Sequence, residues 1–342
     1  MFFDRLFTRN HPQLDWIQIE ISSYCNASCI YCPHCAFRTN WQNRFLPLGA
    51  FRNLVPAFNN TNLVYLQGWG EPFTHPQFFK MLKIAKKAGC RVGTTTNGTL
   101  LDRESIEKIV RQGLDVIGFS LAGVNKKNDK IRKGTHIKKV LLCMEEIRRA
   151  KDRYQVNNPE IHIAYMLLRS GLDDLETLPH FLANTGADQT VVSSLSYVVD
   201  PEMETESKLA SSAEEYSELK VRLLEVRSEA VKRGADLHFH IVAPLQKKFS
   251  CSENIPKAVL VGSNGNLSPC VMKQLPMRGD NYYFFDKKKH LQCNLSFGNI
   301  QKESLTTILR HREYREFVRK FLTGNGPAAC QNCLKKQIEN FS

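Results

Sequence analysis

The sequence has no apolar run that approaches the ~18 residues needed to cross a membrane. It also has no apolar segment typical of a secretory signal, because Asp4, Arg5 and Arg9 interrupt the first ten residues. With neither feature, we expect a cytoplasmic protein with no membrane partner. A disordered or collagen-like chain is excluded as well, because 42% of the 342 residues are apolar and 24% are charged.

An even set of cysteines, as a disulfide framework would need, is also missing. The chain has 11 cysteines, and an odd number without a secretory signal argues against disulfide pairing. Cys90 and Cys143 lie on apolar faces, so we expect them in the core. Two groups hold all the others except Cys293: Cys25, Cys29, Cys32 and Cys35, then Cys251, Cys270, Cys330 and Cys333. Two groups of thiols in a reducing compartment indicate bound metal.

Acidic residues are outnumbered, since 47 Lys and Arg against 34 Asp and Glu give a net charge of +13. Segment 121–153 supplies more than half of this excess, with eleven basic and four acidic residues. A nucleic-acid surface, a site for an anionic substrate and a solvated helix face are the candidate explanations. Aromatic residues are nearly absent from the segment, which favours the solvated face and disfavours a nucleic-acid partner.

Apolar, β-branched runs alternate with stretches of helical periodicity along the first two hundred residues. The runs predict strands at 16–22, 62–68, 91–98, 115–121, 161–168 and 189–198. The periodic stretches predict helices at 76–89, 103–113, 135–154 and 172–186. Asp102 is placed to cap the second of these helices. Such alternation indicates an α/β fold with a parallel sheet, whose ligands bind at the carboxyl ends of the strands.

The composition changes after residue 200. Pro201 begins a polar segment that we predict to be a linker or loop, followed by a helix at about 213–233 and a strand at 237–242. From Cys251 onward, short strands, turns and cysteines predominate. We therefore divide the chain into a core at 16–200, a connecting segment at 201–250 and a small cysteine-rich domain at 251–342.

The first group of cysteines follows directly on the first predicted strand, with the spacing Cys25-x3-Cys29-x2-Cys32. Three such thiolates can hold three irons of a 4Fe-4S cluster and leave the fourth iron open to a small molecule. A zinc site completed by His34 or Cys35 is an alternative. Cys35 also forms a second spacing, C-x2-C-x2-C, with Cys29 and Cys32, and its ligation would close the open iron.

These cysteines and the ends of the following strands together resemble the radical S-adenosylmethionine (SAM) superfamily. The matching positions are Tyr31 before the last cysteine, Gly68-Trp69-Gly70-Glu71-Pro72 after the second strand, Thr96-Asn97-Gly98 after the third, Ser120 in the fourth, and Asp129-x2-Arg132-x-Gly134 beyond it. The second of these is similar to the family's Gly-Gly-Glu-Pro motif. The resemblance covers roughly residues 16–200 and implies a partial (β/α)6 TIM-like barrel.

The resemblance also implies roles for single residues. Cys25, Cys29 and Cys32 would bind the cluster that binds SAM. Backbone carbonyls and the Glu71 carboxylate in the Gly68–Pro72 motif would hold the methionine ammonium. Three further roles concern the rest of the SAM molecule: Tyr31 would line the adenine, Ser120 would contact the ribose or the carboxylate, and Asn97 and Arg132 would complete the pocket.

The second group resembles the C-terminal extension called SPASM, or its shortened form called twitch. Its members are Cys251, Gly265, Cys270, Phe297-Gly298-Asn299-Ile300, Cys330 and Cys333. No cysteine follows Cys333, which favours the twitch form with one auxiliary 4Fe-4S cluster on the four cysteines. Four thiolates would saturate that cluster, which disfavours direct binding of the substrate and leaves it the role of an electron relay or sink. A structural zinc on the same cysteines and the replacement of one ligand by Cys293 are the alternatives.

The resemblance implies reductive cleavage of SAM to a 5′-deoxyadenosyl radical, which takes a hydrogen atom from a substrate. A reductant such as flavodoxin or ferredoxin would supply the electron. The substrate is expected to be a peptide or protein that is matured, with oxidation of a small molecule as the alternative. Only fifteen residues precede the first strand, so no fused leader-binding domain is expected. His238 and His240 share one face of a strand and are weak acid–base candidates.

Overall fold

A computed structural model describes residues 13–243, 251–324, 326–331 and 333–341. Asp4, Arg5 and Arg9, the charged residues that argue against a secretory signal, lie outside the described residues. No helix in the described ranges combines the length and the apolar character that crossing a bilayer requires.

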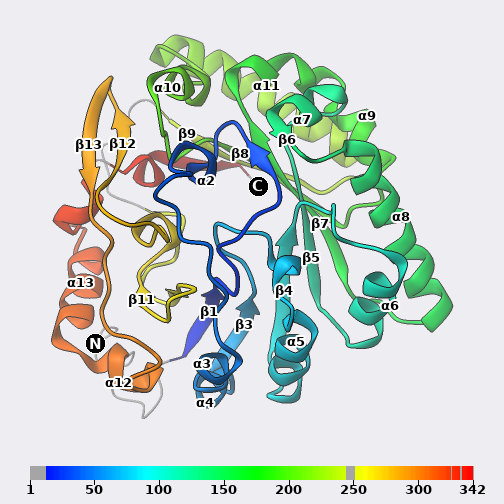
Figure 1. Cartoon of the computed structure of the whole chain (residues 1–342). Helices are drawn as coiled ribbons and strands as arrows, with labels where there is room; N and C mark the ends of the chain where they lie inside the picture. The colour runs from blue at the N-terminus through cyan, green and yellow to red at the C-terminus, as the bar shows by residue number, and fades with distance from the viewer. Residues whose placement is uncertain (1–12, 244–250, 325, 332, 342) are drawn as a thin grey trace.

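The centre of the molecule is a curved, mostly parallel sheet (Figure 1). The six predicted strands are present as β1 (Leu14–Ile19), β3 (Thr61–Tyr65), β4 (Arg91–Thr96), β5 (Val116–Leu121), β7 (Glu160–Leu167) and β8 (Gln189–Ser194). They are neighbours in chain order and all pair in parallel. The predicted α/β class with a partial barrel is therefore confirmed.

Helices cover the outer face of this sheet (Figure 1). They are α3 (Leu48–Arg52), α4 (Val55–Phe58), α5 (Phe78–Lys87), α6 (Arg103–Arg111), α8 (Ile137–Tyr154), α9 (Leu178–Ala183) and α11 (Ala213–Lys232). In α5 the buried side chains Phe78, Met81, Leu82 and Ala85 recur at helical spacing and pack into the core. Asp102 caps α6 as predicted, because its Oδ1 accepts the Ser105 N–H at 2.8 Å.

Two local predictions were wrong. The segment after Asp200 is not a linker throughout, because it begins with the helix α10 (Pro201–Ser207). The Asp200 carboxylate accepts the Met203 N–H at 2.8 Å, and Pro201 occupies the first turn, where it needs no N–H partner. The helix predicted at 172–186 is a 3-10 segment, Arg169–Glu176, followed by the short α9.

The C-terminal segment adds strands to both edges of the barrel sheet. β10 (Ala258–Val261) pairs in parallel with β1, and β11 (Leu267–Ser268) extends that edge. At the other edge β9 (Leu237–Val242) pairs with β8, and β14 (Ile338–Phe341) pairs with β9. The rest of the segment forms the hairpin of β12 (Asn281–Phe285) and β13 (Lys288–Gln292) and the helices α12 (Leu305–Arg310) and α13 (Arg312–Leu322), on the left in Figure 1.

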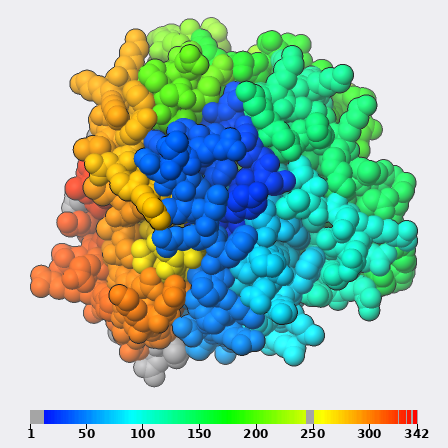
Figure 2. Space-filling model, viewed as in Figure 1, coloured from blue at the N-terminus to red at the C-terminus, as the bar shows by residue number. Residues whose placement is uncertain are grey.

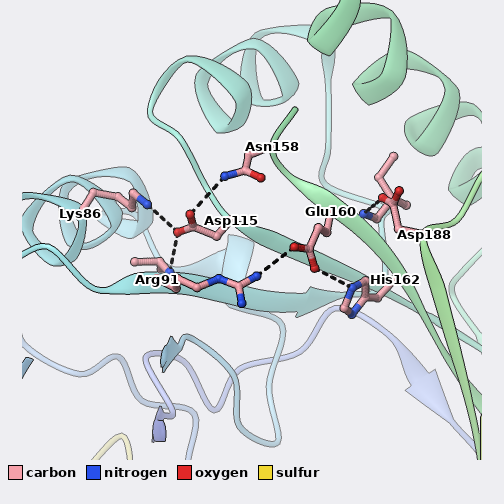
Figure 3. A network of polar contacts seen from close by, with 9 residues as sticks. Lys86, Arg91, Asp115, Asn158, Glu160, His162 and Asp188 are labelled. Carbon is pink, nitrogen blue, oxygen red and sulfur yellow. Dashed lines mark hydrogen bonds and ion pairs between the residues drawn. The ribbon is translucent and has the colours of Figure 1, made fainter. Parts of the chain in front are cut away.

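A polar network braces the amino ends of the central strands, away from the carboxyl ends (Figure 3). Asp115 accepts from Lys86 Nζ at 2.5 Å, from the Val92 N–H at 2.7 Å and from Asn158 at 3.2 Å. Arg91 pairs with Glu160 at 3.0 Å across the next strands. This end of the barrel is closed by structural contacts, so the opposite end is left for chemistry.

Candidate functional site

The first group of cysteines lies in the loop that leaves the carboxyl end of β1. Cys29 is buried in the short strand β2 (Ser28–Cys29), and Cys25 and Cys32 are half-buried on either side. β2 pairs with β6 (Arg132–Lys133), which places Cys29 opposite Arg132. In Figure 2 this dark-blue part of the chain lies over the centre of the viewed face, between the C-terminal segment and the green helices.

The three thiols lie close enough to influence one another. Burial raises the pKa of Cys25 to about 12, and the charges of Glu71 and Cys29 add to the rise. Burial also raises the pKa of Cys32, again with a contribution from Cys29. Thiols such as Cys25 and Cys32, whose pKa is raised by burial, are suited to a metal, because a bound cation replaces their protons.

Cys35 lies just beyond, after the start of the short helix α2 (Pro33–Ala36). Its thiol is half-buried, and burial together with the charge of Cys29 raises its pKa. Arg38 and Lys133 act in the opposite direction. Cys35 is thus near both the cysteine loop and a basic part of the surface, and its part in cluster binding stays a prediction to be tested.

The Gly68–Pro72 motif is pressed against the cysteine loop at the end of β3. A Cβ on Gly70 would lie 2.4 Å from the Ser22 carbonyl oxygen and 2.6 Å from that of Tyr24, so only glycine fits. The Glu71 N–H donates to the Tyr24 carbonyl at 2.8 Å. This contact fixes the motif beside the loop that carries Cys25.

The Glu71 carboxylate joins the motif to the end of β4. It is 2% exposed and accepts from Thr96 Oγ1 and the Asn97 N–H, both at 2.7 Å, and from the Phe73 N–H at 3.2 Å. Burial raises its pKa, and the hydrogen bonds from Asn97 and Thr96 oppose that rise. The Asn97 side chain continues the network, donating to Asn26 in the cysteine loop at 2.9 Å.

Arg132 and Tyr31 form the opposite side of this group. Arg132 is buried and donates through Nη1 to the Tyr31 hydroxyl, while its charge acts on Cys25. Its Nε is buried and has no hydrogen-bond partner in the part of the chain that the structure describes. A buried guanidinium with an unused donor fits an anionic ligand such as the carboxylate of SAM. Ser120, half-buried near the end of β5, completes the predicted set.

The four cysteines predicted for the second site line one cavity. Their neighbours there include Glu253, Lys273 and Lys335. Burial raises the pKa of Cys251 to about 12 and of Cys330 to about 11. Cys293, the alternative ligand, is exposed and is not among the lining residues, so that alternative is not supported.

The spacing of the thiols matters for the kind of metal. Among the described residues, no three His, Cys, Asp or Glu side chains converge closely enough to bind a single metal ion. A four-iron cube holds its thiolate ligands further apart than one tetrahedral zinc ion does. Thiolates ligate both zinc and iron–sulfur clusters, so the donor sets of both sites are compatible with clusters.

Several residues that connect the two cysteine sites were not predicted. Glu20, 1% exposed near the end of β1, accepts from the Trp69 N–H at 2.9 Å and from Ser263 Oγ at 2.8 Å. The Trp69 indole N–H lies 3.1 Å from the carbonyl oxygens of both Val271 and Gln274. The Gly68–Pro72 motif is thereby tied to the segment around Cys270. In the sequence, the signal for this contact was an acidic residue, Glu20, within an apolar run.

A line of aromatic rings runs between the sites. The centroids of Trp69 and Tyr197 lie 5.7 Å apart, and those of Tyr197 and Tyr283 lie 6.1 Å apart. Burial raises the pKa of Tyr283 to about 12, with added contributions from Cys333 and Cys330. Tyr283 therefore lies near the second cysteine set, while Trp69 belongs to the Gly68–Pro72 motif.

The fold and these two thiol sites define a class, that of barrel proteins that bind iron–sulfur clusters and SAM at the carboxyl ends of the strands. Comparison with known families agrees: residues 19–178 match the model of the radical SAM superfamily, and residues 251–334 match an iron–sulfur cluster-binding domain, SPASM. The two matches span more than half of the chain, and the chain belongs to the radical SAM superfamily. It accordingly binds SAM, a 4Fe-4S cluster and an auxiliary 4Fe-4S cluster.

One relative and two solved structures are similar along nearly the whole chain. A tungsten-containing aldehyde ferredoxin oxidoreductase cofactor-modifying protein of Pyrococcus furiosus is 25% identical, with 96% of this chain and 89% of that protein covered. Streptococcus suis SuiB bound to SAM has a TM-score of 0.69 at 17% identity, covering 97% of this chain and 74% of that one. The structure of anSMEcpe with bound SAM has a TM-score of 0.65 at 17% identity, covering 93% and 88%. The two structures support the fold.

Proposed function

We propose that this protein is a radical SAM maturase that abstracts a hydrogen atom from a peptide or protein substrate. A reduced 4Fe-4S cluster with SAM supplies the 5′-deoxyadenosyl radical for that abstraction. The observation that carries the proposal is the meeting of three cysteines, the Gly68–Pro72 motif and Arg132 at one barrel end. Three thiolates rather than four leave an iron for SAM.

The chain's own residues bind and orient SAM in this proposal. Cys25, Cys29 and Cys32 would ligate the cluster, and the Glu71 carboxylate would hold the methionine ammonium. Arg132 would offer its unused Nε–H to the carboxylate of SAM, and its hydrogen bond to Tyr31 would hold that ring for the adenine. Asn97 and Ser120 line the remaining strand ends.

We assign Cys251, Cys270, Cys330 and Cys333 to the auxiliary cluster, where four thiolates leave no iron open to substrate. An electron relay or sink is the role that remains, and the ring line from Trp69 to Tyr283 supports it. We retain 16–200, 201–250 and 251–342 as the proposed domains, although β10 and β14 make one sheet with the barrel.

Maturation is favoured over small-molecule oxidation by the similarity to a cofactor-modifying protein along 96% of the chain. The two structural neighbours have also been solved with peptides, SuiB with the precursor peptide SuiA and anSMEcpe with a Cp18Cys peptide. Half-buried apolar side chains near both sites pack against one buried apolar cluster, and such a surrounding suits a peptide side chain. They include Tyr31, Trp69, Met166, Met272 and Tyr283.

An experiment with two arms tests the substrate class. The reconstituted enzyme, SAM and dithionite are incubated anaerobically with a fully deuterated extract of the source cells, separated into macromolecules and a small-molecule filtrate. We expect deuterium in 5′-deoxyadenosine with the macromolecular fraction. Deuterium transfer from the filtrate alone would replace maturation by small-molecule oxidation, and absence of SAM cleavage in both arms would overturn the proposed activity.

We further propose that the reductant is an acidic protein such as flavodoxin or ferredoxin, acting in the cytoplasm. Residues 21–70 contain no Asp or Glu, and Arg38 and Lys133 are exposed beside the cysteine loop. Opposite charge speeds protein association.

Arg38→Glu with Lys133→Glu should slow cluster reduction by flavodoxin hydroquinone but not by dithionite. Equal rates with flavodoxin before and after the change would refute this docking face.

A further inference from the structure

The cavity of the auxiliary cysteines contains a lysine with no ionic partner. Lys273 is 6% exposed and lines the cavity together with Cys330 and Cys333. Its Nζ donates to Gln292 Oε1 at 3.1 Å, and no carboxylate within the described ranges forms an ion pair with it. The Gln292 amide nitrogen donates to the Met272 carbonyl, which directs Oε1 toward the lysine.

The second lysine of the cavity differs in this respect. Lys335 forms an ion pair with Glu253 at 2.8 Å, and the two side chains are only 21% and 18% exposed. Their charges therefore compensate each other. Lys273 contributes the remaining positive charge to the cavity, and a neutral amide does not balance it.

A buried cation is costly unless an anion lies near it. The anions available to Lys273 are the four cysteine thiolates, which together outweigh the positive charge of the cluster core that they hold. One-electron reduction makes such a centre more negative still. A fixed ammonium beside it therefore stabilises the reduced state more than the oxidised state.

We propose that Lys273 is a positioning residue of the auxiliary centre that raises its reduction potential, so that the centre takes up the electron released by the substrate radical. The inference rests on the proposed function and deepens it. After loss of a hydrogen atom the substrate carries one unpaired electron. Transfer of that electron to the oxidised auxiliary cluster and of one proton to solvent leaves the substrate oxidised by two electrons in total and the cluster reduced by one.

The test measures potential rather than turnover. The auxiliary cluster is loaded in a background where Cys25, Cys29 and Cys32 are alanine, and its midpoint potential is followed by electron paramagnetic resonance during a redox titration. Lys273→Met should lower the ratio of reduced to oxidised cluster at least tenfold at a fixed solution potential, which is about 59 mV for one electron. Lys273→Arg should keep the ratio within threefold, because it keeps the charge.

Two further variants separate charge from packing. Gln292→Glu retains the lysine but supplies a carboxylate to pair with it. The reduction potential of the auxiliary cluster should therefore fall in this variant, as it should in Lys273→Met. Lys320→Met removes an exposed lysine of α13, next to Phe321 of the cavity, and should change little because water screens that charge.

The outcomes are distinct from those for the proposed function. The role of Lys273 would be overturned if both Lys273→Met and Gln292→Glu bound four irons and kept the ratio of reduced to oxidised cluster within threefold of the parent. That result would leave SAM cleavage untouched. If Lys273→Met fails to load iron, Gln292→Glu alone decides. Failure of the parent enzyme to cleave SAM would refute the proposed function without changing the measured potential.

Discussion

Replacing the Glu71 carboxylate by an amide separates its structural work from its proposed contact with SAM. Oε1 accepts two protein hydrogen bonds and Oε2 accepts the Asn97 N–H at 2.7 Å. In Glu71→Gln the single amide oxygen can accept either the hydrogen bonds of Oε1 or that of Oε2, but not both. If it replaces Oε1, the new NH2 faces the Asn97 N–H, and two donors meet in a buried place.

The expected cost follows from that mismatch. A buried donor left without an acceptor costs about 1–3 kcal/mol, so the free energy of unfolding should fall by that amount. Loss of the charged contact to the ammonium should weaken SAM binding by about 1.5–3 kcal/mol, roughly 10- to 150-fold in Kd. The assays are urea unfolding followed by circular dichroism and anaerobic equilibrium dialysis with labelled SAM.

Glu104→Gln is the matched control, because Glu104 is 75% exposed on α6, where it pairs with Lys108. It should change stability by less than about 1 kcal/mol and leave SAM binding unaltered. If Glu71→Gln loses stability but binds SAM normally, Glu71 is a brace and not a ligand. If it loses neither, the hydrogen-bond argument itself is wrong.

Three further predictions concern other parts of the chain. Cys25→Ala should lose about four irons and the dithionite-dependent release of 5′-deoxyadenosine, whereas Cys35→Ala should keep both; the reverse pattern in iron analysis and product assay would assign the cluster to the other spacing. Trp69→Phe should lower the free energy of unfolding by about 1–2 kcal/mol, since its indole N–H no longer reaches the two carbonyls; unchanged urea unfolding would count against that link. The hydrogen bond from the Ser105 N–H lowers the pKa of Asp102, so the cap stabilises the fold above the unfolded-state pKa of about 3.9 and loses that effect as pH falls through the folded-state pKa. Asp102→Asn should keep a cap without that pH dependence, and Asp102→Ala should lower the free energy of unfolding by about 0.5–2 kcal/mol. Unfolding curves at several pH values will check both.

The six central strands could be predicted because local patterns determine them. Each apolar run is bounded by glycine, proline or a capping residue, and parallel strands buried on both faces need little alternation. The start of α10 was missed because its cap, Asp200, precedes a polar run with no apolar stripe.

The candidate site divides in the same way. The cysteine spacing and the Gly68–Pro72 motif are local in sequence and were found, whereas contacts over long sequence distances were not. Glu20 accepts from Ser263, more than two hundred residues away in the sequence. Lys273 could not be singled out before the fold placed it in one cavity with Cys330 and Cys333. Such pairings are set by the folded sheet, so single-sequence patterns carry no record of them.

The strands that flank the barrel have a consequence for damage by oxygen. β10 follows Cys251, β11 precedes Cys270, and β14 follows Cys333, so the proposed auxiliary ligands adjoin the outermost strands at both sheet edges. A cluster on these cysteines would cross-link the segments at the two sheet edges and stabilise both, because metal binding contributes to folding. Its oxidative loss would loosen β14 and β10 and uncover the backbone of β9 and β1, which are templates for aggregation. Air exposure should therefore show itself first as light scattering by the whole protein, before the barrel core itself unfolds.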